Sequence, residues 1–97
     1  MSVIVIINLS TKDGSVEEIK KFLKEKLPDT RSFEGCQGVQ LYGNRESPSK
    51  LVLHEKWDSE EAHKKYRSWR METGAEDKLG SMLSEPLSMQ FYNIVDE

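Results

Sequence analysis

Hydrophobic and polar positions alternate along the chain with two different periods. Residues 3–9 are almost all β-branched or aliphatic and predict a strand that is apolar on both faces. A period of two predicts further strands, and apolar residues three and four positions apart predict helices. The predicted elements, in order, are a strand over 3–9, a helix over 15–27, strands over 39–42 and 51–57, helices over 58–72 and 75–83, and a strand over 87–95.

Local signals set the ends of the two longer predicted helices. Ser15 followed by Glu18 has the spacing of a capping box, and we expect Pro28 to end or kink the first helix. Ser59 precedes two acidic residues that suit the first turn of the second helix. A Thr-Gly pair at 73–74 ends that helix.

The resulting order, βαββαβ with an extra helical segment, predicts a ferredoxin-like α+β fold. This fold has a four-stranded antiparallel sheet with helices on one face. We expect a single domain over residues 1–97. Strands that are apolar on both faces leave an apolar sheet surface that the helices do not cover. A homodimer would bury that surface, and the alternative is a monomer with a partly apolar sheet face.

Composition and charge exclude several classes of function. The 97 residues carry a net charge of −3, so no overall positive field attracts nucleic acid or an anionic membrane. The longest apolar run, residues 3–7, is too short to span a membrane, and without a charged leader we expect a cytoplasmic protein. Cys36 is the only cysteine, and there are two histidines and no glycine-rich nucleotide motif. We therefore expect no bound metal, flavin or nicotinamide cofactor.

Asn8 is the first candidate functional residue, since a polar amide here ends an apolar strand. We expect it to point to the helix-covered face, toward the stripe formed by Ala62, Tyr66 and Trp69. Two interpretations stay open: Asn8 caps the strand end or the following turn, or its amide reaches into a cavity and binds a substrate oxygen.

A second cluster of candidates lies on the helix over 58–72. Tyr66 and Trp69 share its apolar face, and we expect Trp69 to be both core and cavity wall. Arg70 follows about 100° around the helix, at the cavity mouth or on the surface. Of the two histidines, His54 lies in a predicted strand, whereas His63 is interpreted as a solvated surface residue.

Three stretches together resemble the antibiotic biosynthesis monooxygenase (ABM) domain family, whose members include quinol monooxygenases with a dimeric α/β-barrel. The stretches are 33–36, 53–62 and 69–74, and the most specific is the pattern Glu-x-Trp-x-Ser-x-x-Ala at 55–62. The resemblance covers nearly the whole chain. Tyr66 stands where many quinol monooxygenase-like members have a histidine.

The resemblance implies a cofactor-independent monooxygenase that oxidises a small aromatic molecule, a quinol or polyketide phenol, with dioxygen. Asn8 and Trp69 would donate hydrogen bonds, Tyr66 and His54 would relay protons, and Arg70 would hold an anionic oxygen of the substrate. The alternative is a non-catalytic dimer of the same fold that binds a small molecule or has a structural role. A third, weaker hypothesis is a metal- or haem-binding protein.

Overall fold

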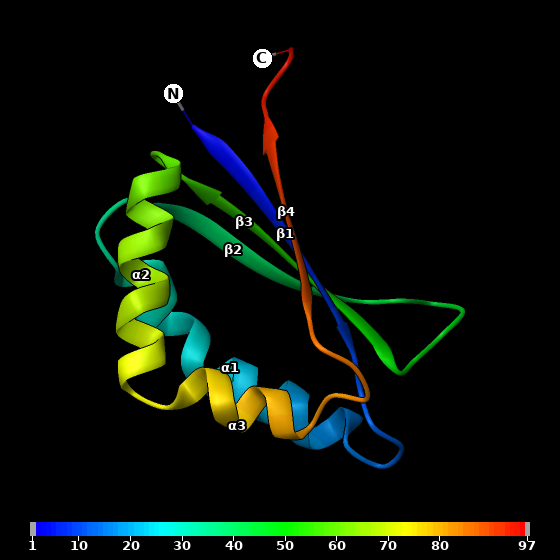
Figure 1. The fold of residues 1–97 in the computed structure, drawn as a ribbon. Helices are drawn as coiled ribbons and strands as arrows, with labels where there is room; N and C mark the ends of the chain where they lie inside the picture. Colours follow the sequence, from blue (N-terminus) through cyan, green and yellow to red (C-terminus); the bar gives the residue numbers. More distant parts are fainter. Residues whose placement is uncertain (1, 97) are drawn as a thin grey trace.

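A computed structural model describes residues 2–96. Its order of strands and helices confirms the βαββαβ prediction, with the extra helix before the last strand (Figure 1). Strand β2 begins three residues earlier than expected, at Cys36, and the last strand is shorter than expected. The elements are β1 (Val3–Ser10), α1 (Val16–Ser32), β2 (Cys36–Gly43), β3 (Lys50–Trp57), α2 (Glu60–Glu72), α3 (Ala75–Ser81) and β4 (Ser88–Asn93).

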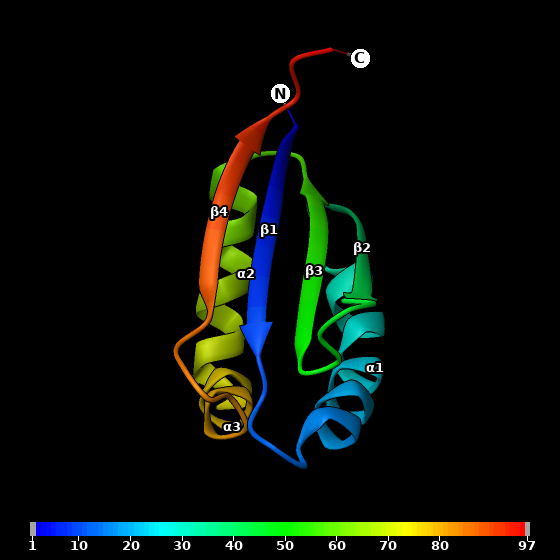
Figure 2. The ribbon, with the colours of Figure 1, turned by 90° about the vertical axis from the view of Figure 1, so that its right-hand side faces the viewer.

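The four strands form one antiparallel sheet in the order β2-β3-β1-β4. All three helices lie on the same face of this sheet (Figure 1). Figure 2 looks onto the opposite face, which no helix or strand of residues 2–96 covers. This two-layer arrangement is the predicted ferredoxin-like α+β fold.

Strand β1 shows which set of side chains faces the helices. Val5 is fully buried, and the other odd-numbered residues of the strand are buried too, whereas Ile4 and Ile6 are only half-buried and Asn8 is exposed. The prediction that Asn8 points toward the helices is therefore wrong. Exposed His54 pairs with Ile6 across the sheet and lies on the same open face. A strand that is apolar on both faces carries no signal of which parity is buried.

Helix α1 runs through Pro28 instead of ending there. Pro28 is exposed, so the carbonyl group that loses its backbone hydrogen-bond partner on that side of the helix can bind water. The expected capping box is absent, because Ser15 makes no side-chain cap hydrogen bond. None of the helices within residues 2–96 is both long and apolar enough to cross a membrane.

A close backbone approach fixes the start of α2 against the sheet. Gly35 has a φ of +92°, and a Cβ atom there would lie 2.6 Å from the Cβ of Ala62 and 3.9 Å from the Trp57 ring. The Ser59 hydroxyl accepts a hydrogen bond from the backbone N–H of Ala62 at 3.1 Å, as expected for an N-cap. These contacts hold α2 over β3, where its inner face meets the sheet.

Candidate functional site

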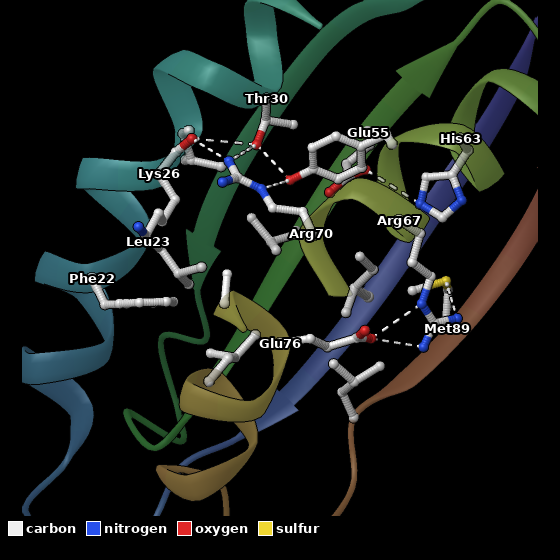
Figure 3. Close-up of a pocket in the computed structure, with 17 residues that line it drawn as sticks. Phe22, Leu23, Lys26, Thr30, Glu55, His63, Arg67, Arg70, Glu76 and Met89 are labelled. Atoms are coloured by element: carbon white, nitrogen blue, oxygen red, sulfur yellow. Dashed lines mark hydrogen bonds and ion pairs between the residues drawn. The ribbon is translucent and has the colours of Figure 1, made fainter. Parts of the chain in front are cut away.

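A cavity of about 90 Å³ lies between the sheet and the three helices (Figure 3). Its apolar wall comes from the sheet and from α1, including Ile7, Leu53 and Leu27. Helix α2 supplies most of the polar wall, because positions 63, 66, 67 and 70 lie on one helix face. The titratable side chains that line the cavity are Lys26, Glu55, His63, Tyr66, Arg67, Arg70 and Glu76.

Arg70 is the centre of a hydrogen-bond network at one end of the cavity. Its Nε donates to the Tyr66 hydroxyl at 2.8 Å, and its Nη2 donates to the Lys26 carbonyl at 2.8 Å and to the Thr30 hydroxyl at 3.1 Å. The Thr30 and Tyr66 hydroxyl oxygens are 2.7 Å apart. The network therefore joins α1 to α2 and fixes the guanidinium group at the cavity wall (Figure 3).

The charge of Arg70 has no acidic partner. The residue is only 8% exposed, and within residues 2–96 its guanidinium forms no ion pair. Its central carbon lies 4.6 Å from the centre of the Trp69 ring and 5.3 Å from that of Tyr66, so aromatic faces flank the cation. Buried charges are ordinarily paired, and an unpaired guanidinium that lines a cavity is suited to bind an anionic oxygen.

Glu55 carries a second polar group into the cavity wall, from strand β3. Its side chain is buried, and its Oε1 accepts a hydrogen bond from Trp57 Nε1 at 2.8 Å. The same oxygen lies 3.8 Å from Nε2 of His63, which is too far for a hydrogen bond. Burial raises the pKa of the Glu55 carboxyl and lowers the pKa of the His63 imidazole. The raised pKa of Glu55 makes its carboxylate more basic, and the lowered pKa of His63 disfavours the imidazolium, so the short separation does not indicate a stable ion pair.

Tyr66 is held in its protonated form. Burial raises the pKa of its phenol, although the hydrogen bonds with Thr30 and Arg70 act in the opposite direction. Because Arg70 donates to the phenol oxygen, the phenol hydrogen is available to Thr30 or to a ligand. Tyr66 can therefore serve as a hydrogen-bond donor next to the guanidinium.

An ion pair lies at the other end of the cavity. Arg67 from α2 contacts one oxygen of Glu76 from α3 at 2.8 Å through Nη2 and at 3.1 Å through Nε (Figure 3). Its Nη1 is 3.7 Å from the sulfur of Met89 on β4. Both charged side chains are partly exposed, so this pair forms the rim of the cavity.

The structure brings together only part of the predicted site. Tyr66 and Arg70 line the cavity, whereas Trp69 is not among its lining residues and instead packs behind the Arg70 guanidinium. Asn8 and His54 lie on the opposite face of the sheet, exposed, and neither lines the cavity. Their predicted roles have no geometric support here.

The sequence analysis did not propose five of the seven titratable cavity residues, namely Lys26, Glu55, His63, Arg67 and Glu76. His63 is 2% exposed, so its interpretation as a surface residue is wrong; it packs edge-on against the Trp57 ring, with centroids 5.5 Å apart. Choosing positions 63, 66, 67 and 70 as the inward face of the helix, instead of 62, 66 and 69, would have predicted that His63 is buried. Glu55 could have been found from parity, since Leu53 and Trp57 on either side of it are core residues of the same strand.

The cavity does not have the ligands of a metal centre. Within residues 2–96, no group of three or more His, Cys, Asp or Glu side chains is placed to hold a metal ion. The two closest candidates, Glu55 and His63, provide a single carboxylate and a single imidazole. The polar groups of the cavity instead suit hydrogen bonding and proton transfer.

Known proteins share the fold of this chain, and a family model matches its sequence. The family model described as antibiotic biosynthesis monooxygenase matches residues 2–70, which is more than half of the chain. No curated protein matches the sequence.

Solved structures with the same fold are distant in sequence. Rv0793 from Mycobacterium tuberculosis superposes with a TM-score of 0.89 at 23% identity, covering 100% of this chain and 98% of that one. A conserved protein from Methanosarcina mazei gives 0.88 at 20% identity, covering 96% and 92%. SnoaB from Streptomyces nogalater, a cofactor-independent oxygenase, gives 0.86 at 10% identity, covering 99% and 95%. At these identities the likeness establishes the fold alone.

Proposed function

Because the chain belongs to the antibiotic biosynthesis monooxygenase family, we propose that it is a monooxygenase that oxidises a quinol with dioxygen and needs no cofactor. SnoaB, which shares the fold, is itself a cofactor-independent oxygenase. The cavity between sheet and helices is the proposed active site.

The observation that carries this proposal is the buried, unpaired guanidinium of Arg70. A quinol reacts with dioxygen far more readily after it loses a proton, because the anion is the better electron donor. Arg70 and the Tyr66 hydroxyl converge on one end of the cavity and would stabilise that anionic oxygen. Trp69 holds the guanidinium in place from behind.

The substrate supplies all the electrons that this reaction needs. A quinol and one dioxygen molecule give a hydroxyquinone and one water molecule, so no external reductant is required. The protein then has to bind the anion, exclude bulk water and accept one proton. A cavity whose wall exposes mostly apolar surface is suited to this task.

The size of the cavity favours a single ring. About 90 Å³ is well below the roughly 300–1,000 Å³ of typical ligand sites. A quinol therefore suits the cavity better than a polyketide phenol with several fused rings. The rim pair of Arg67 and Glu76 is partly exposed and can separate to admit the ring.

We further propose that the active form is a homodimer, paired through the open face of the sheet. Ile4, Ile6 and Val52 are half-buried on this face, with the exposed rings of Tyr42 and Tyr92 alongside them. A second copy would cover these side chains without blocking the cavity, which lies on the other side of the sheet.

A second candidate is a protein that binds a small anionic aromatic without turnover. The observation in its favour is that Asn8 and His54, two of the residues predicted to act on the substrate, lie outside the cavity. Ligand binding without oxygen consumption would distinguish this function from the first.

Oxygen uptake with a panel of substituted hydroquinones and anthrones, in air, tests the proposal. We expect uptake with single-ring quinols above the spontaneous rate, and at least a tenfold fall in kcat/KM for Arg70→Met, equivalent to about 1.4 kcal/mol. Arg45→Met is the matched control, because Arg45 is an exposed arginine in the β2–β3 connection. Uptake that is no faster than without protein, or that Arg70→Met leaves unchanged, would contradict it.

A further inference from the structure

We infer that Glu55 is the proton acceptor of the site, taking the phenolic proton of the substrate whose anion then faces Arg70. This inference rests on the proposed function, because it supplies the base that the oxidation of a quinol requires. It assigns a chemical role to a carboxyl group in the core of the protein.

The position of Glu55 is the first argument. Strand β3 alternates, and its inward positions otherwise hold Leu51, Leu53 and Trp57, which are core residues. An ionised carboxyl group among these core residues costs folding free energy unless its charge is compensated. Its presence here therefore suggests a functional role. Glu55 lies in the cavity wall, on the sheet side, while Arg70 projects from α2.

Within residues 2–96, Glu55 forms no ion pair with a lysine or an arginine. Its Oε1 has one hydrogen-bond donor, the neutral indole N–H of Trp57 at 2.8 Å. The His63 imidazole is 3.8 Å away, and burial together with the charge of Arg67 lowers its pKa, so it stays neutral. Figure 3 shows Glu55 and His63 side by side at the cavity wall.

Most of the charges on the surrounding elements oppose the pKa shifts of Glu55 and His63 without reversing them. Arg70 on α2 lowers the pKa of Glu55, but desolvation is the larger effect and the net direction is upward. On the His63 side, Glu60 on α2 and Glu76 on α3 partly offset Arg67. A carboxylate with a raised pKa is a stronger base, and on accepting a proton it becomes neutral, which burial favours.

The proton transfer is balanced within the cavity. The phenolic O–H bond of the substrate breaks, and an O–H bond forms on the Glu55 carboxyl. One negative charge moves from Glu55 to the substrate oxygen, where the guanidinium of Arg70 can compensate it. No proton leaves the site and no other reactant is needed.

A purely structural role for Glu55 makes a different prediction. The only hydrogen bond that the carboxyl group makes within residues 2–96 is with the indole of Trp57, and a glutamine oxygen can accept the same bond. Glu55→Gln would therefore keep the packing and remove only the base. Circular dichroism and thermal melting confirm that the variant is folded before it is used.

The test uses para-nitrophenol, a single-ring phenol that dioxygen does not oxidise. The dye is titrated into the wild-type protein at a pH below its solution pKa. Its absorbance reports whether it is bound as phenol or phenolate, and calorimetry in buffers of different ionisation enthalpy counts the protons released. We expect phenolate bound with no proton released by the wild type. With Glu55→Gln we expect either bound phenol or one proton released per phenolate.

Glu61→Gln, an exposed position on the same helix as His63, is the matched control and should behave as the wild type. Dye bound by the wild type as neutral phenol, or as phenolate with one proton released to the buffer, would overturn the inference. The wild-type proton count needs no variant, so a proton released to the buffer would overturn the inference even if Glu55→Gln does not fold.

Turnover separates this inference from the proposed function. If the wild type oxidises quinols, Glu55→Gln should lower kcat by about a hundredfold or more. The defect should shrink for quinols that are already ionised in solution. An unchanged kcat would overturn the role of Glu55 but would not contradict the proposed monooxygenase function. Internal proton transfer from bound dye to Glu55 without any oxygen uptake would refute the monooxygenase instead, and the role of Glu55 as proton acceptor would remain.

Discussion

Two buried ionisable residues give this cavity its chemical character. Arg70 is a fixed cation with no acidic partner within residues 2–96, and Glu55 is a carboxyl group with one neutral donor. Arg70 donates hydrogen bonds to the Lys26 carbonyl and to the Tyr66 hydroxyl, but both acceptors are neutral and leave its positive charge uncompensated. Such an arrangement gains free energy when an anion enters, which is why the site favours a deprotonated substrate.

The pH dependence of stability should reveal the buried state of Glu55. Burial raises its pKa in the folded protein, so the unfolded chain gives up this proton at a lower pH than the folded one. Its contribution to stability is present below the unfolded pKa of about 4.3 and is lost as the pH rises through the folded pKa. Relative to wild type, Glu55→Gln should therefore become more stable as the pH rises above about 4.3.

Urea denaturation of both proteins at several pH values measures this difference. Both carry His63, whose lowered pKa makes stability fall as the pH drops below about 6.5, so that opposite trend largely cancels in the comparison. A difference in the free energy of unfolding that is constant with pH, or that falls as the pH rises, would show that Glu55 is not buried in this way.

At the level of elements, the site depends on how helix α2 is placed. Gly35, which precedes β2, allows the first turn of α2 to approach the sheet at Ala62, next to Trp57. From there the helix presents two residues to the cavity: His63, which directly follows Ala62, and Arg70, about two turns further along. A shift of this helix would separate the anion-binding group from the sheet.

Gly35→Ala should destabilise the protein by roughly 1–3 kcal/mol. The added Cβ would lie 2.6 Å from the Cβ of Ala62, and the φ of +92° is unfavourable for alanine. Gly80→Ala is the control, because that glycine lies within α3 with open space around it. The control should be neutral or stabilising by up to about 1 kcal/mol. Equal melting temperatures for the two variants would argue against the close approach.

The sequence carries enough information for the elements but less for the site. The alternation of β3 and the helical spacing of α2 predict the ferredoxin-like fold, since each periodic pattern is decided locally. Long-range packing decides which face of β1 meets the helices. Because both faces of that strand are apolar, the sequence pattern alone predicts the wrong side for Asn8. The inward face of α2 is similarly ambiguous: His63 lies among lysines in the sequence yet is buried in the fold.

At the scale of the whole molecule, the open face of the sheet is the surface still to be explained. It combines half-buried aliphatic residues with the two exposed rings of Tyr42 and Tyr92. The proposed homodimer would place two sheets face to face, with the helices and both cavities on the outside. Each cavity would then be built from the residues of one chain.

Ile6→Lys tests this assembly, because Ile6 lies on the open face in the strand between β3 and β4. Sedimentation velocity at micromolar concentration should show a dimer for the wild type and a monomer for the variant, since a buried lysine at the interface has no partner. Lys21→Glu, an exposed change on α1, should remain dimeric. A monomeric wild type would contradict the proposal.

The most direct test of the central claim is turnover of a hydroquinone under isotopically labelled dioxygen, followed by mass spectrometry of the product. A monooxygenase that uses the substrate's own electrons should place one labelled oxygen atom in the hydroxyquinone and the other in water. The label should appear with wild type and Arg45→Met, without added flavin, nicotinamide or metal, and fall at least tenfold with Arg70→Met. A product without label, or label that arises equally fast without the protein, would contradict the claim.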